Sequence, residues 1–198
     1  MCRTFAFLMI FLLLFAVQVG SASEMGNATL HDLSSQKVPP SIEALQAAYE
    51  HGKSKLHTSD ADEINKTELL YLAYGLDFID FSSNNYNISL TLSEEDVFHI
   101  ETIASAAHEA YVSGALSQEN LLSFSKIFAG YLGLLITHHK GGTWVPEVKG
   151  MEDSGPAIQK DAGEYYFVLS KVFRRLQNGS EDNLVHFYQI IPYDPPVE

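Results

Sequence analysis

Two adjacent histidines, His138 and His139, are the side chains of this 198-residue sequence that most readily suggest chemistry. They lie within FAGYLGLLITHHKGGTWV, residues 128–145, beside a double glycine and the only tryptophan of the chain. The apolar spacing before them predicts a helix, in which neighbouring side chains point about 100° apart. The two imidazoles therefore do not readily bind one metal ion together. We interpret them as residues at a helix end, although either can still be a ligand with partners elsewhere in the fold.

A second polar group follows helical spacing. Glu101, Ser105 and His108 are separated by four and then three residues, so they share one face of a predicted helix. Such a face can support acid–base catalysis or bind a metal, and it can equally be a polar surface in contact with water. A zinc-protease helix needs a second histidine four residues after His108, but Val112 stands there. The enzyme alternative is therefore a metal-dependent or hydrolytic enzyme that uses Glu101, His108 and His138.

The signatures of common catalytic classes are missing from the sequence. It contains no Gly-x-Ser-x-Gly nucleophile motif, no phosphate-binding glycine loop and no dinucleotide-binding fingerprint. The single cysteine, Cys2, falls in an N-terminal segment that we expect to be removed, which excludes thiol catalysis in the mature chain. We therefore assign no catalytic residue, no metal ligand and no cofactor, and we favour a non-enzymatic protein while leaving the enzyme alternative open.

Aromatic side chains gather in the last third of the chain. Tryptophan and tyrosine dominate the energetics of protein interfaces, so an exposed cluster of these residues would be a recognition surface. The candidate binding residues are Trp144, Tyr165, Tyr166 and Arg174. The alternative, that the aromatic rings pack in the core around a small sheet, stays open.

Apolar residues at helical spacing divide most of the chain into helices. They are predicted from Ser41, over residues 64–79, from Ser93 to Tyr111, from Ser117 to Lys140, and around residues 172–176 and 184–191. The helix that ends near Lys140 is apolar around much of its circumference, so we expect it at the centre of the fold. Gly130 and Gly133 would let another element approach its backbone closely.

Short extended segments follow the glycine pair, in which Gly141 or Gly142 can end the central helix. Strands are predicted at residues 143–148, 157–160 and 165–169, although the third can instead begin the next helix. The predicted fold class is α+β, a predominantly helical single domain with a small C-terminal β-sheet. The domain spans residues 41–191, after a flexible linker at 23–40 and before a tail at 192–198.

The N-terminus has the pattern of a secretory signal peptide over residues 1–22. Arg3 precedes an apolar run at residues 5–19, which is shorter than the roughly 20 residues that span a bilayer, and small residues follow it. We therefore expect a periplasmic or secreted protein. The lack of cysteine after residue 22 favours a bacterial periplasm, whereas N-glycosylation sequons keep a eukaryotic secreted origin open; they are at Asn27, Asn65, Asn87 and Asn178.

The chain is strongly acidic, with a formal net charge of −13. Nucleic acids and anionic membrane surfaces are therefore disfavoured as partners. The charge can simply keep the protein soluble, or it can steer the protein toward a basic protein partner.

One stretch resembles a known kind of protein. GYLGLLITHHKGGTWV and, further on, LSKVFRRLQNGSEDNLVHFY are similar to a diffuse group of uncharacterised bacterial exported domains, in which a Gly-Tyr-x-Gly helix runs into a Gly-Gly-x-Trp strand. The match covers residues 120–190. This resemblance implies a binding or toxin-immunity module and carries over no catalytic residues. The group often has an acid where this chain has Leu134, so a role tied to that acid is not implied here.

The sequence thus predicts an exported non-enzymatic binding protein, of which a periplasmic toxin-neutralising (immunity-like) protein is one form. In that form an acidic and aromatic surface would cover the site of a basic partner.

Overall fold

The computed structural model describes residues 39–58, 65–160 and 163–193. The predicted signal peptide, nearly all of the predicted linker and residues 194–198 of the predicted tail lie outside these ranges. Within them the chain forms a mostly helical α+β fold with one small antiparallel sheet, which confirms the predicted fold class.

The helices and strands follow one another in a simple order. The helices are α2 (Ile42–Lys55), α3 (Lys66–Tyr86), α4 (Asp96–Val112), α5 (Gln118–His139), α6 (Val168–Asn178) and α7 (Leu184–Ile190). Between α5 and α6 lie β1 (Thr143–Val145), β2 (Ala157–Gln159) and β3 (Tyr165–Tyr166), with the short 3₁₀ turn η2 (Glu152–Ser154) before β2; a second such turn, η3 (Ser180–Asp182), precedes α7. The sheet has the order β1-β2-β3 with antiparallel pairing throughout.

Local sequence accounts for several helix starts. The side chains of Ser41 and Ser117 accept hydrogen bonds from the backbone N–H groups of Ala44 and Asn120, as capping serines do. The helix predicted from Ser93 begins at Asp96. Ser93 donates its backbone N–H to the Asp96 carboxylate at 3.2 Å, so here the acid, not the serine side chain, is the acceptor.

Three predicted boundaries are wrong. The second predicted helix continues as α3 to Tyr86, because the buried Ser82 hydroxyl donates to the Ile88 carbonyl and Asn87 ends the helix in the left-handed conformation. The first strand stops at Val145, directly before Pro146, which has no N–H for a ladder. The third extended segment is only two residues long, and α6 begins at Val168.

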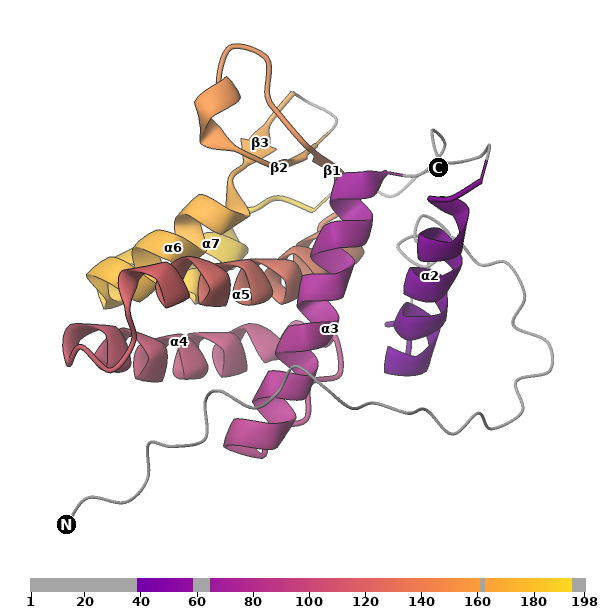
Figure 1. Cartoon of the computed structure of the whole chain (residues 1–198). Helices are drawn as coiled ribbons and strands as arrows, with labels where there is room; N and C mark the ends of the chain where they lie inside the picture. Colours follow the sequence, from indigo (N-terminus) through magenta and orange to yellow (C-terminus); the bar gives the residue numbers. More distant parts are fainter. Residues whose placement is uncertain (1–38, 59–64, 161–162, 194–198) are drawn as a thin grey trace.

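The central helix is α5, as its apolar circumference predicts. In Figure 1, α3 crosses α5, α4 runs beside it, and α6 and α7 lie at its other side with the sheet above them. By length and composition α5 would suffice to cross a membrane, but 67% of its most apolar stretch is buried inside the protein. It is therefore the core helix around which the other elements pack.

The two predicted close approaches to α5 occur at its glycines. A Cβ at Gly130 would lie 2.4 Å from the backbone N of Gly75, where α3 crosses, and a Cβ at Gly133 would lie 2.3 Å from Cζ2 of Trp144. The indole fills that space and stacks on Tyr71 at 3.8 Å between ring centroids. These contacts fix the sheet and α3 against the same end of α5.

Candidate functional site

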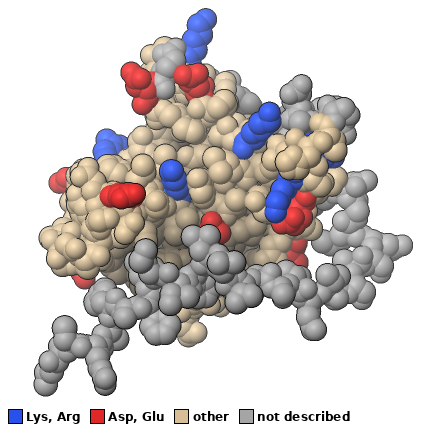
Figure 2. Space-filling model, viewed as in Figure 1, with Lys and Arg blue, Asp and Glu red and all other residues tan. Residues whose placement is uncertain are grey.

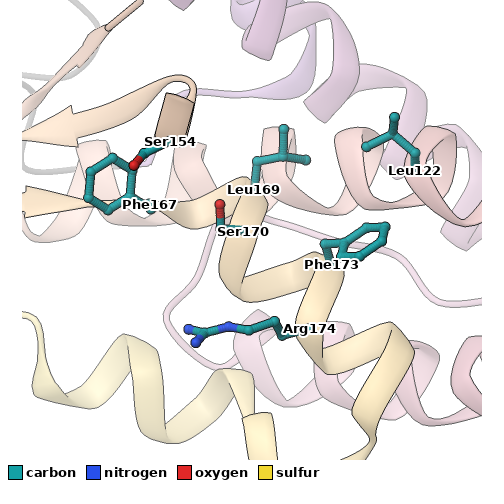
Figure 3. Close-up of a pocket in the computed structure, with 7 residues that line it drawn as sticks. All are labelled: Leu122, Ser154, Phe167, Leu169, Ser170, Phe173 and Arg174. Atoms are coloured by element: carbon teal, nitrogen blue, oxygen red, sulfur yellow. The ribbon is translucent and has the colours of Figure 1, made fainter. Parts of the chain in front are cut away.

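A groove runs along the outer side of α6. It has a volume of about 610 Å³ and is lined by Leu122, Ser154, Phe167, Leu169, Ser170, Phe173 and Arg174. Figure 3 shows that α6 and the residue before it supply most of the lining, with Leu122 coming from α5 and Ser154 from η2. Four apolar side chains, two hydroxyls and one guanidinium thus share one hollow, a composition typical of binding sites.

The amphipathic sequence of α6 builds this groove. One face of the helix buries Val168, Val172 and Leu176 in the core. The neighbouring face carries Leu169 and Phe173, four residues apart and only partly buried. Because residues four apart lie one above the other on a helix, the two side chains form a continuous apolar strip that the fold leaves partly open.

Among the described residues that line the groove, Arg174 is the only charged one. Its nearest acid is Asp182, which already accepts hydrogen bonds from Lys171 at 2.9 Å and from Asn178 at 3.0 Å. The Lys171 hydrogen bond holds the pKa of Asp182 below its ordinary value. The Nε atom of Arg174 lies 3.7 Å from Asp182, beyond hydrogen-bond distance, and the side chain is 60% exposed. Its guanidinium therefore keeps its donors largely available.

The predicted polar face of α4 is a structural cluster. Glu101 accepts from Nε of the buried Arg175 at 2.8 Å and from the Leu184 N–H at 2.9 Å, while Ser105 accepts from the same guanidinium at 2.7 Å. Nδ1 of His108 lies 3.0 Å from the Leu176 carbonyl. These groups tie α4 to α6 and α7, so the interpretation of the trio as a water-exposed face is wrong, and its polar atoms are engaged within the fold.

The histidine pair lies apart from that cluster. Nε2 of His139 is 2.7 Å from the Leu92 carbonyl, whereas Nδ1 of His138 is buried without a hydrogen-bond partner. Burial, with a smaller effect of His139, lowers the pKa of His138. Within residues 39–58, 65–160 and 163–193, no three His, Cys, Asp or Glu side chains are placed to hold a metal ion. The structure thus does not gather Glu101, His108 and His138 into a metal site.

The four candidate binding residues do not form one patch. Trp144 is only 2% exposed and packs on Tyr71 and Gly133, so its selection as a surface residue is wrong. Tyr165 and Tyr166 are half-buried in β3, and Arg174 alone of the four lines the groove. The alternative prediction, that the aromatic rings pack in the core, is correct for Trp144.

Sequence reasoning missed the apolar part of the groove. The available signal was the spacing of Leu169 and Phe173, which places them beside the core face of α6 rather than on it. No local sequence pattern predicts that Leu122 and Ser154 line the groove, because only the folded chain brings α5 and η2 to this face.

A second polar cluster fastens the C-terminal residues. Lys140 is buried, and its Nζ lies 3.5 Å from Glu94, 3.2 Å from the ring centroid of Tyr193 and 4.8 Å from that of Tyr188. Both tyrosine hydroxyls donate to Glu94, and Lys160 donates to the carbonyls of Lys140 and Pro192. Lys140 follows the last residue of α5 and, through these contacts, also anchors the end of the described chain.

No protein-family model, curated protein or solved structure matches this chain. The resemblance to exported bacterial domains therefore stays a prediction.

Proposed function

We propose that this protein is a non-enzymatic binding protein that holds a short segment of a partner protein in the groove beside α6. The observation that carries the proposal is an apolar strip made of the exposed Leu122 and the partly buried Leu169 and Phe173, in a hollow of about 610 Å³. Covering large apolar side chains in such a hollow lowers the free energy of the complex, because it removes apolar surface from water. Export to the periplasm or beyond remains part of the proposal and rests on residues 1–22.

Binding is favoured over catalysis by the way the polar residues are used. Glu101, Ser105 and His108 already bond to other helices, and the polar groups among the described residues that line the groove are two hydroxyls and a guanidinium. A guanidinium stays protonated in proteins and cannot act as a general base, so this lining is suited to recognition.

The net charge of the whole chain bears on the kind of partner, less directly than the groove does. A net charge of −13 favours a partner with net positive charge. On the face in Figure 2, however, acidic and basic side chains are scattered among uncharged ones. The contact is therefore proposed to depend on apolar side chains in the groove, and neutralisation of a basic toxin is one form that such binding would take.

A displayed library of random peptides tests the proposal directly. Wild-type protein is expected to enrich peptides with two or more large apolar residues. Leu122→Glu, which puts a charge on the apolar wall at a position 44% exposed in the folded protein, is expected to lower the affinity of the enriched peptides at least tenfold.

The matched control is Val112→Glu, which makes the same kind of change at an apolar residue that is 70% exposed on α4 and does not line the groove. It is expected to bind the same peptides as the wild type. Failure of the wild type to enrich any peptide, or equal loss of binding in both variants, would refute the proposal.

A further inference from the structure

The charge of the groove points to one feature of the segment that it holds. We propose that the bound segment carries a carboxylate, an aspartate or glutamate next to its apolar residues, and that Arg174 recognises this group. The inference rests on the proposed function, because it concerns the ligand of the same groove.

The positive charges around Arg174 outnumber the negative ones. Two cations, Lys171 and Arg174, lie within 4 Å of the single carboxylate of Asp182. Lys171 is the closer one, with a hydrogen bond of 2.9 Å and a side chain only 15% exposed. Asp182 is thus largely satisfied by Lys171 and Asn178, which leaves the charge of Arg174 only partly compensated.

The Arg174 side chain lies at the groove. Arg174 lines the same hollow as Ser170 and Phe173, and in Figure 3 its side chain extends on the side of the α6 ribbon opposite Leu122 and Leu169. A guanidinium offers a planar pair of N–H donors that fits the two oxygens of a carboxylate. A ligand whose apolar side chains cover Leu169 and Phe173 would bring a neighbouring carboxylate within reach of these donors and of the exposed Ser170 hydroxyl.

The net charge of the protein does not oppose this local contact strongly. Charges in physiological salt are screened over about 8 Å, so the remaining acids of the chain act weakly on a group held at Arg174. A cationic group in the same place would face the guanidinium directly, and like charges at that distance repel. A partner with net positive charge can still present one acidic residue beside its apolar ones.

Two substitutions at the same position provide a matched test. Ser170→Glu places a carboxylate four residues before Arg174 on the helix, a favourable arrangement for an ion pair, so the protein would supply the proposed group itself. Ser170→Gln adds a side chain of the same size without charge. Ser170 is exposed and makes no part of the core, so both variants are expected to fold as the wild type does.

The peptide selection is repeated on the wild type, Ser170→Gln, Ser170→Glu and Arg174→Gln. The wild type is expected to enrich Asp or Glu at one position relative to the apolar residues, and Ser170→Gln shows the effect of a larger uncharged side chain in the groove. Ser170→Glu and Arg174→Gln should keep the apolar enrichment and lose the acidic one. Replacing Glu by Gln in the best peptide should weaken its binding to the wild type about tenfold, the size of one charged hydrogen bond, and leave its binding to Arg174→Gln unchanged.

The outcomes separate the two proposals. Apolar peptides without an enriched acid, or an acid still enriched on Arg174→Gln, would overturn the role of Arg174 and leave the groove as a binding site. No enrichment on the wild type would instead refute the proposed function, and the inference with it.

Discussion

Two adjacent arginines have opposite environments in this protein. Arg175 is 2% exposed and bonds to Glu101 and Ser105, whereas Arg174 is 60% exposed in the groove. Because neighbouring helical residues point about 100° apart, one face of α6 binds the core and the next meets water. Arg175 therefore stabilises the fold, whereas Arg174 is available to a ligand.

Arg175→Leu is expected to lower the free energy of unfolding by about 3–5 kcal/mol, because it leaves the Glu101 carboxylate and the Ser105 hydroxyl without their buried partner. Arg174→Leu should change it by less than about 0.5 kcal/mol, as exposed substitutions usually do. Urea unfolding of both variants measures the difference. Similar losses in the two variants would contradict the assigned environments.

His138 predicts a pH effect on stability. Burial lowers its folded pKa below the ordinary value of 6.5, so below that pH the unfolded chain takes up a proton that the folded chain does not. Stability should therefore fall as the pH drops from about 6.5 toward the folded pKa. Urea unfolding at pH 7.5, 6.5 and 5.5 should show a smaller loss for His138→Gln than for the wild type. Parallel losses would show that His138 titrates normally.

At the scale of single residues, sequence reasoning found the right side chains more often than their roles. Glu101, Ser105 and His108 do share a face, but spacing alone could not show that Arg175, some 70 positions away, occupies it. Burial of Trp144 likewise depends on Gly133 and Tyr71, which come from two other elements. Such roles depend on long-range contacts that no local pattern contains.

At the scale of elements, the glycines of α5 decide how closely its neighbours approach. Gly133 leaves the space that the Trp144 indole fills, and Gly130 does the same for the backbone of α3. The sequence predicted these approaches because a helix apolar on most sides needs neighbours, and glycine removes the side chain that would keep them apart.

Gly133→Ala would put a methyl group 2.3 Å from Cζ2 of Trp144, so the indole must move. We expect a loss of about 1–3 kcal/mol, typical of an overpacked core. Trp144 is the only tryptophan, so its fluorescence reports both the unfolding and any displacement toward water. Ser123→Ala, at an exposed position of the same helix, should change neither. Unchanged stability in Gly133→Ala would contradict this packing.

Most elements were predictable and the groove between them was not. Apolar spacing locates α2, α4 and α5 closely, and capping serines mark the starts of α2 and α5, because these signals are local. The end of α3 was missed, since Ser82 is a turn-favouring residue that here is buried and bonds to Ile88. The groove needs η2, α5 and α6 together, and their arrangement follows from the tertiary fold.

At the scale of the whole molecule, the described part of the chain is a packed helical core that leaves an apolar strip partly open beside α6. Polar clusters around Arg175 and Lys140 hold the C-terminal helices and the last described residues against that core. The groove therefore lies on α6, whose buried face is held against the core. A site that binds a partner segment repeatedly requires such a rigid element.

The most direct test of the central claim is a map of the bound peptide on the protein. The isotope-labelled full chain is titrated with the best peptide from the selection while its backbone amide NMR shifts are recorded. The account predicts saturable shifts concentrated at Leu122, Ser154 and residues 167–174, and none of comparable size around Val112. Shifts concentrated elsewhere, for example around Lys140 and Tyr193, or no saturable shifts at all, would contradict it.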